Sequence, residues 1–217
     1  EEEKDSIKLI LIGDSGTGKT NLITVAAGFE FDSHSLSTMS CSYIQKIYKK
    51  HNVEYKINIW DTIGQESFKS LTKIFVNDSK IIILVYDITN KKSFEALPFW
   101  KKMVDDILDA QPVFAVVGNK MDLYDQEEVK ADEADKYAKS IWAKVLITSA
   151  MQDPNSFSNF IGELLDDYLL KDKGQRRKSF YLNKNNNNKE NNNKNCCWLI
   201  ITWLMSNYNI IKLYIAF

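Results

Sequence analysis

Hydrophobic residues in the first 170 positions form short continuous runs, and these runs alternate with stretches that have helical spacing. Continuous apolar runs are typical of strands that a sheet buries on both faces. Regular alternation of such strands with helices predicts an α/β fold with a parallel sheet. The runs are 7–12, 81–86, 113–117 and 144–148, and the helical stretches are 21–27, 93–110, 132–142 and 154–170.

Two further segments, 43–48 and 53–60, alternate apolar and polar residues and are separated by a short polar turn. This pattern predicts an antiparallel hairpin. If Ile57 and Ile59 face inward, the period of two turns Trp60 outward, either to a partner or beneath a helix. We therefore expect a six-stranded, mostly parallel sheet with one antiparallel edge strand and helices on both faces.

The segment GDSGTGKT at residues 13–20 joins the first predicted strand to the first predicted helix. Its spacing, G-x-x-x-x-G-K-[ST], in this context is typical of a phosphate-binding loop. Glycines let successive N–H groups point at phosphate oxygens, and the helix N-terminus adds partial positive charge. Lys19 would reach the β- and γ-phosphates, and the Thr20 hydroxyl would ligate Mg²⁺. These residues favour a nucleotide site over a flexible glycine turn.

The segment DTIGQ at 61–65 follows a predicted strand. Such strand ends are where doubly wound sheets bind ligands. The Asp61 carboxylate can hold Mg²⁺ through water, Gly64 can offer its N–H to the γ-phosphate, and Gln65 can orient an attacking water. Alone, the segment is equally compatible with an ordinary turn.

A third segment, NKMD at 119–122, follows the predicted strand at 113–117. The Asp122 carboxylate can accept two parallel N–H bonds from guanine, and adenine lacks that pair of donors. The Lys120 stem is suited to cover the base. Backbone N–H groups of 148–150 can meet the base carbonyl. The base is therefore expected to be guanine.

Together these segments resemble a small GTPase of the Ras superfamily, most similar to its Rab branch, over about residues 6–170. Residues 68–72 and 85–89 also resemble that branch, and Thr38 falls at its switch I threonine. The resemblance implies Mg²⁺ ligation by Thr20, Thr38 and Asp61, and catalysis by Gln65 and Lys19. It implies GTP or GDP contacts from Asp14, Ser15, Gly16, Thr17, Gly18, Lys19, Thr20, Asn21, Thr38, Gly64, Asn119, Lys120, Asp122, Ser149 and Ala150.

The resemblance implies a GTP/GDP switch with slow GTPase activity in vesicle or membrane trafficking. Effectors would meet an aromatic triad of Tyr43, Trp60 and Phe75, and an exchange factor and a GTPase-activating protein would act on the switch. The only arginines are Arg176 and Arg177, outside the domain, so a partner's arginine would speed hydrolysis. Two alternatives are a nucleotide-locked module that hardly hydrolyses GTP and an ATP-dependent phosphotransferase.

Several positions depart from the family pattern. Met39-Ser40 follows Thr38 where the family has Ile-Gly, Ile63 replaces an alanine, and Met151 replaces a lysine. The aromatic that covers the guanine edge falls at Ala26, with Phe29 as a substitute. These departures concern base affinity, switch-loop order and partner identity more than phosphate binding.

Composition narrows the remaining possibilities. A net charge of −1 and a sequence pI near 6.2 exclude a general nucleic-acid footprint. Three cysteines, Cys41, Cys196 and Cys197, favour a reducing compartment over a disulfide framework. The acidic start lacks the apolar run of a signal peptide, and we expect a cytoplasmic monomer.

We expect four regions: a disordered N-terminus at 1–5, the GTPase domain at 6–170, a disordered basic and Asn-rich linker at 171–195, and a double-cysteine, apolar tail at 196–217. Prenylated Cys196 and Cys197 would hold the protein on the cytosolic face of an intracellular membrane. Two unmodified thiols are the alternative. Residues 198–217 could be a tail anchor, an extension that packs elsewhere, or read-through beyond Cys197.

Overall fold

The computed structural model describes residues 6–31, 42–50, 52–62 and 75–187. The chain divides into two compact units, Glu1–Asp172 and Lys173–Phe217, and the contacts below belong to the first. The strands are β1 (Ile7–Ile12), β2 (Ser42–Lys50), β3 (Val53–Asp61), β4 (Ile81–Asp87), β5 (Val113–Asn119) and β6 (Lys144–Ile147). The helices are α1 (Lys19–Ala26), α3 (Lys91–Glu95), α4 (Leu97–Asp105), the 3₁₀ helix η2 (Met121–Gln126), α5 (Ala131–Ser140) and α6 (Pro154–Asn187).

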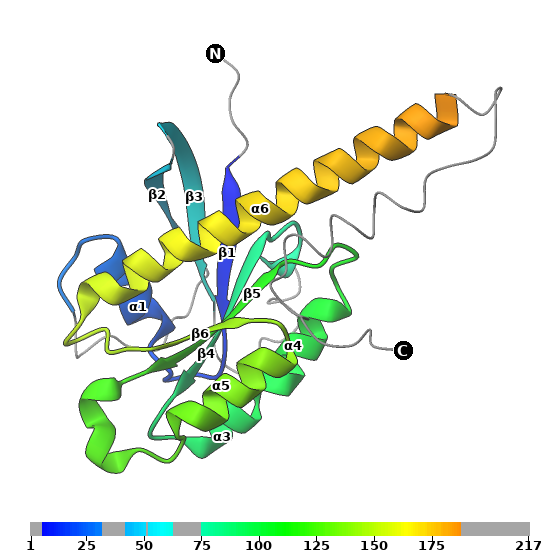
Figure 1. Ribbon diagram of the computed structural model, residues 1–217. Helices are drawn as coiled ribbons and strands as arrows, with labels where there is room; N and C mark the ends of the chain where they lie inside the picture. The colour runs from blue at the N-terminus through cyan, green and yellow to red at the C-terminus, as the bar shows by residue number, and fades with distance from the viewer. Residues whose placement is uncertain (1–5, 32–41, 51, 63–74, 188–217) are drawn as a thin grey trace, which may run out of the picture. The chain divides into compact units, whose positions relative to one another are not determined.

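The six strands form one sheet in the order β2-β3-β1-β4-β5-β6 (Figure 1). All neighbours are parallel except β2 and β3, which pair antiparallel from Ser42↔Asp61 to Lys50↔Val53. The predicted sheet is therefore confirmed. Because β1 lies between β3 and β4, the strand order reverses beside it, and such a switch point is where open α/β sheets bind ligands.

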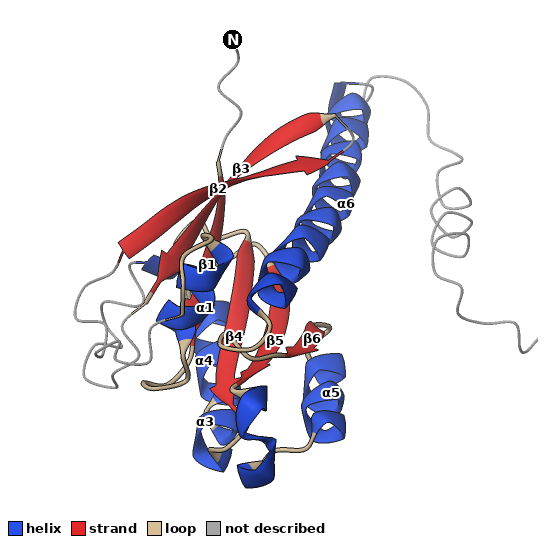
Figure 2. Cartoon of the chain, turned by 90° about the vertical axis from the view of Figure 1, so that its left-hand side faces the viewer, coloured by secondary structure: helices blue, strands red, loops and turns tan. Residues whose placement is uncertain are grey.

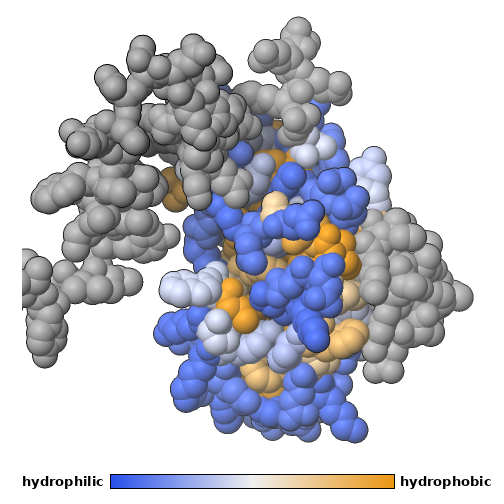
Figure 3. All heavy atoms as spheres, turned by 90° about the vertical axis from the view of Figure 1, so that its right-hand side faces the viewer, coloured by the Kyte–Doolittle hydropathy of each residue, from blue (hydrophilic) through white to orange (hydrophobic). Residues whose placement is uncertain are grey.

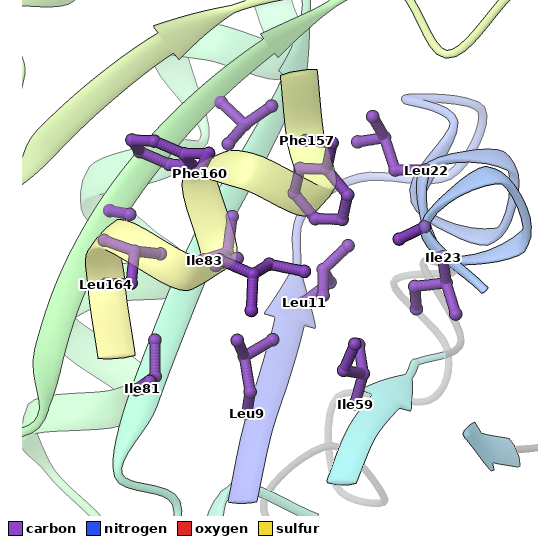
Figure 4. Close-up of a cluster of buried hydrophobic side chains, with 14 of the residues drawn as sticks. Leu9, Leu11, Leu22, Ile23, Ile59, Ile81, Ile83, Phe157, Phe160 and Leu164 are labelled. Carbon is purple, nitrogen blue, oxygen red and sulfur yellow. The ribbon is translucent and has the colours of Figure 1, made fainter. Parts of the chain in front are cut away.

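Helices cover both faces of the sheet, and a separate hydrophobic core fills each side (Figures 1 and 2). Alternation along β1 divides its residues between the cores: Leu9 and Leu11 pack with α1 and α6, whereas Ile10 and Ile12 pack with α3, α4 and α5. Figure 4 shows Phe157, Phe160 and Leu164 of α6 over the first core. Burial on both faces explains why β1 reads as a continuous apolar run.

The edge strand β2 is fastened to the first half of α6. The Lys46 ammonium donates hydrogen bonds to the Ala26 carbonyl, at the end of α1, and to Ser158 Oγ at 2.7 Å. The Lys50 ammonium lies 2.7 Å from Asp166 Oδ2. Burial lowers the pKa of Lys46, and its ammonium also lies 5.6 Å from the Tyr48 ring centroid. One side chain of β2 therefore joins α1 to α6.

Two helices differ from the expected pattern. The stretch 93–110 contains two helices, because Pro98 has no N–H to extend the ladder through α3 and instead occupies the first turn of α4. Helix α6 continues to Asn187 rather than ending at Leu170, and the segment beyond Leu170 is rich in lysine and arginine, which favour helix. The predicted division at 170/171 and 195/196 stays a prediction.

The expected turn of Trp60 away from Ile57 and Ile59 is seen, but Trp60 faces the second core and is half-buried there. The face drawn in Figure 3 is mostly hydrophilic over the described residues, with small hydrophobic patches between. Among those residues no helix has the length and apolar character needed to cross a bilayer. Cys196, Cys197 and residues 198–217, for which lipidation, anchoring or read-through is predicted, lie outside the described part of the chain.

Candidate functional site

The loop at 13–20 connects the carboxyl end of β1 to α1, which begins at Lys19, two residues before the expected start at Asn21. Two of its glycines are required by close approach. A Cβ on Gly13 would lie 2.1 Å from the Val85 carbonyl oxygen. A Cβ on Gly18, whose φ is +87°, would lie 2.3 Å from Asn119 Nδ2. The sequence G-x-x-x-x-G is therefore imposed by β4 and β5 as well as by the loop itself.

Lys19 is buried, and its ammonium donates hydrogen bonds of 2.8 Å to the carbonyl oxygens of Gly13 and Asp14. Burial lowers the pKa of Lys19 to about 8, although Asp61 and Asp14 favour the charged form. A bound anion would favour the ammonium further. The lysine is thus held across the loop, with its charge incompletely compensated by the protein.

Thr20 and Asp61 supply a pair of oxygens beside the loop. The Thr20 hydroxyl donates to Asp61 Oδ2 at 2.8 Å, and Asp61 is buried at the end of β3. The next residue, Thr62, donates its hydroxyl to the Leu11 carbonyl at 2.6 Å, which ties β3 to β1. Hydroxyl and carboxylate oxygens suit Mg²⁺, which binds through one or two carboxylates plus phosphates. Within the described residues no cluster of three His, Cys, Asp or Glu side chains could hold a metal.

Asn119 connects the loop at 13–20 to the segment at 148–150, which is predicted to meet the base. Its Nδ2 donates to the Thr17 carbonyl at 3.0 Å, and its Oδ1 accepts from the Ala150 N–H at 3.2 Å. The Ser149 hydroxyl donates to Asp122 Oδ1 at 2.5 Å. The structure therefore brings together three segments that are far apart in sequence: 13–20, 119–122 and 148–150.

Asp87 and Trp100 also contact these residues, and no sequence motif assigns either of them a role. The Lys120 ammonium lies 2.6 Å from Asp87 Oδ2. The Trp100 indole N–H, buried on α4, donates to Asp14 Oδ1 at 2.8 Å. A buried indole N–H needs a hydrogen-bond acceptor, so a tryptophan on the apolar face of a predicted helix indicates that such an acceptor exists. The identity of the acceptor depends on the fold.

Asp14 places a carboxylate in the phosphate-binding loop, where its negative charge would repel phosphate. Its Oδ1 is bonded to Trp100, while its carbonyl oxygen accepts hydrogen bonds from Lys19 and from the Thr17 hydroxyl at 3.0 Å. We infer that Asp14 serves the loop through its backbone. Its predicted contact with nucleotide stays a prediction.

The other predicted site residues fall into two groups. Ser15 and Gly16 are exposed, and Asn21 is half-buried. Thr38, Gly64 and Gln65 lie outside the described residues, as do Met39, Ser40 and Ile63.

The two positions predicted for an aromatic near the base differ in burial. Ala26 is fully buried in the first core, and Phe29 is 70% exposed. Phe31 is half-buried and packs against that core. The placement of Phe29 beside the guanine edge stays a prediction.

The three aromatic residues expected to meet effectors lie together. The Tyr43 and Trp60 rings stack with centroids 4.9 Å apart, and Phe75 lies 5.9 Å from Trp60. Lys8 places its ammonium 4.9 Å from the Trp60 ring centroid. Tyr43 is 54% exposed and presents this cluster to solvent.

Comparison with known proteins gives consistent matches. The family model described as "Ras family" matches residues 8–167. Ras-related protein Rab-13 of Bos taurus is 37% identical over 172 residues, which are 79% of this chain and 84% of that protein. Rab-12 of Homo sapiens is 33% identical over 165 residues, 76% of this chain and 68% of that protein. Rab-21 of Bos taurus is 36% identical over 148 residues, 68% and 67% of the two chains.

Proposed function

This chain belongs to the Ras family of small GTPases and resembles its Rab proteins, and from that premise we propose how its own residues work. We propose a GTP/GDP switch that hydrolyses GTP slowly and acts in vesicle or membrane trafficking. The observation that carries the proposal is the pair of hydrogen bonds made by the Asn119 side chain. One goes to the Thr17 carbonyl in the phosphate loop, and the other comes from the Ala150 N–H in the segment 148–150. It supports one continuous nucleotide site.

On the phosphate side, Lys19 supplies charge and the backbone of 13–20 supplies N–H donors. Thr20, Thr38 and Asp61 would hold Mg²⁺, whose chemistry is to neutralise charge on the β- and γ-phosphates. The Thr20–Asp61 hydrogen bond of 2.8 Å supports this assignment, because it places two suitable oxygens together.

On the base side, Asp122 would select guanine. Ser149 holds one carboxylate oxygen of Asp122, which limits how the other can turn. Lys120 would cover the base with its stem, and Ser149 and Ala150 would meet it through the backbone. Phe29 is proposed as the aromatic neighbour of the base.

Hydrolysis would use Gln65 to orient the attacking water, and GTP would order the segments around Thr38 and Gly64. Turnover alone would be slow, because both arginines lie beyond residue 170 and a partner's arginine is worth about 10³–10⁵-fold.

The experiment is single-turnover phosphate release from protein loaded with GTP. Gln65→Leu should retain GTP and release phosphate at least about tenfold more slowly, because the nucleophile is no longer oriented. Gln126→Leu changes an exposed glutamine of η2 in the same way and should match the wild type. Unchanged release from Gln65→Leu would refute the role given to Gln65.

A nucleotide-locked module is the second candidate, favoured by Ile63 beside Gly64 and by Met39-Ser40 after Thr38. Multiple-turnover phosphate release, with and without an activating protein, separates the two. Competition between GTP and ATP, together with identification of the nucleotide carried by purified protein, tests the choice of guanine.

Membrane attachment and partner binding are proposed on sequence and family grounds. Cys196 and Cys197 would carry lipid chains, since two chains give stable anchoring. Mass spectrometry of the native C-terminus would show lipid adducts, free thiols or an earlier chain end. The Tyr43–Trp60–Phe75 cluster is proposed as the surface for effectors, with an exchange factor and an activating protein acting on the neighbouring switch segments.

A further inference from the structure

We propose that Asp87 is a positioning residue for the base side of the nucleotide site. The inference rests on the proposed function. It starts from one ion pair, in which the Lys120 ammonium lies 2.6 Å from Asp87 Oδ2. By holding the ammonium, Asp87 sets the place of the lysine stem before the base arrives.

Asp87 is fixed from several directions. It is the last residue of β4, pairs in register with Asn119 of β5, and is 6% exposed. Its Oδ1 accepts hydrogen bonds from the Thr89 N–H at 2.9 Å and the Thr89 hydroxyl at 2.7 Å. Its N–H donates to Ser93 Oγ at 3.0 Å. The second oxygen, Oδ2, is therefore presented to Lys120 by a carboxylate that cannot easily turn.

Lys120 needs such a partner because of where it lies. It follows β5 with φ 68°, in the left-handed region, and its side chain remains 34% exposed. A lysine at a strand end otherwise samples many rotamers, and fixing it on ligand binding opposes that binding. Contact with Asp87 orders the side chain beforehand, while the aliphatic stem stays available to an apolar ring.

A purely structural role is the competing explanation, in which the ion pair only clamps the ends of β4 and β5. The two roles predict different readouts. An ion pair with only a structural role changes the melting temperature and leaves the dissociation rate of guanine nucleotide unchanged. A positioning residue alters the rate at which guanine nucleotide leaves, and its effect disappears once Lys120 has lost its charge.

The test is dissociation of fluorescent GDP into excess unlabelled GDP with Mg²⁺ present, followed by stopped flow. Asp87→Asn keeps the size of the side chain and an oxygen for Thr89. It should dissociate GDP about 3–10-fold faster than the wild type, the range for one long side chain no longer ordered in advance. Asp125→Asn makes the same change at an exposed position of η2 and should dissociate GDP at the wild-type rate.

Two additional measurements separate positioning from other effects. Lys120→Met keeps an apolar stem without the charge, and adding Asp87→Asn to it should give no further increase, because either change breaks the same pair. The increase with Asp87→Asn should also be equal for GDP and GTP and persist in EDTA, because it arises at the base and not at the phosphates.

A wild-type dissociation rate in Asp87→Asn, additive rates in the double variant, or an increase that vanishes in EDTA would each overturn the proposal. If Asp87→Asn does not fold, Thr89→Val keeps the charge but removes one bond to the carboxylate. It should raise the rate about twofold, and an unchanged rate there would count against the proposal equally. Failure of the wild type to bind GDP at all would instead overturn the proposed function, before any variant is compared.

Discussion

Asn119→Ala is the change that most directly tests how the nucleotide site is assembled. The asparagine amide joins the Thr17 carbonyl at 3.0 Å and the Ala150 N–H at 3.2 Å, and the residue is 2% exposed. Alanine removes both bonds and leaves a buried carbonyl and a buried N–H without these partners. The variant should therefore lose stability and loosen the contact between the two sides of the site.

The size of the loss follows from those two bonds. Each bond is worth about 1 kcal/mol net, and each buried group left unsatisfied costs about 1–3 kcal/mol, so the two together give an expected loss of about 2–6 kcal/mol. For a domain of this size 1 kcal/mol corresponds to a shift of about 2–4 °C in melting temperature. The melting temperature should fall by about 4–24 °C.

The assay is thermal unfolding followed by circular dichroism over a series of GDP concentrations, which separates intrinsic stability from ligand linkage. Asn58→Ala is the matched control. Asn58 bonds Gln45 and Ser6 at the surface of β3, and its loss should cost less than about 0.5 kcal/mol. A melting temperature for Asn119→Ala equal to that of Asn58→Ala would refute the reasoning.

A second comparison uses Gly18. A Cβ at this position would meet Asn119 Nδ2 at 2.3 Å, in addition to the strain of its positive φ. Gly18→Ala should therefore cost less stability in the Asn119→Ala background than in the wild type, because the amide is absent there. An equal loss of free energy of unfolding in both backgrounds would show that the close approach of Gly18 and Asn119 does not affect stability.

Three other changes have expected outcomes. Tyr86→Phe removes a buried hydroxyl that has no hydrogen-bond partner among the described residues. It should raise the free energy of unfolding, measured in urea, by about 1 kcal/mol, and a lower value would contradict this. Trp142 is 93% exposed and has φ 57° just after α5, where glycine is favoured. Trp142→Gly should therefore raise the free energy of unfolding by about 1 kcal/mol, and an unchanged or lower melting temperature would refute this. Burial lowers the pKa of Lys19 from 10.5 to about 8, so the charged form is disfavoured in the folded state. The free energy of unfolding of the nucleotide-free protein should therefore increase as the pH rises from about 8 to 10.5. Urea unfolding of Lys19→Met across that range should lack this gain, and parallel curves for the two proteins would contradict it.

Much of the fold was predictable because burial on both faces leaves a plain pattern in the sequence. The run at 7–12 became β1 without a change of bounds, and the hairpin differed by only a few residues at its ends. The break between α3 and α4 was less accessible, since helical spacing continues across it and only Pro98 marks it. Helix α6 exceeded its expected length because the signal used was loss of apolar spacing, whereas helix propensity persists in the polar segment.

The site residues divide along similar lines. Lys19, Thr20 and Asp122 were predictable because their chemistry is local to a motif with fixed spacing. Trp100 and Asp87 were not, because their roles depend on partners 86 positions away in one case and one strand away in the other. Sequence motifs therefore predict ligand contacts more readily than they predict the partners that hold the contacting residues in place.

The fastening of β2 has a consequence for the segment between α1 and β2. Residues 27–41 leave from the end of α1, where the Ala26 carbonyl accepts the Lys46 ammonium, and return at β2, to which Lys46 itself belongs. The same ammonium bonds Ser158 of α6, so both ends of the segment are tied to one helix. The last turn of α1 and the edge strand β2 therefore depend on one ammonium group for their connection to each other and to Ser158. Replacing Lys46 would remove both connections at once, whereas Lys50 would still join β2 to Asp166.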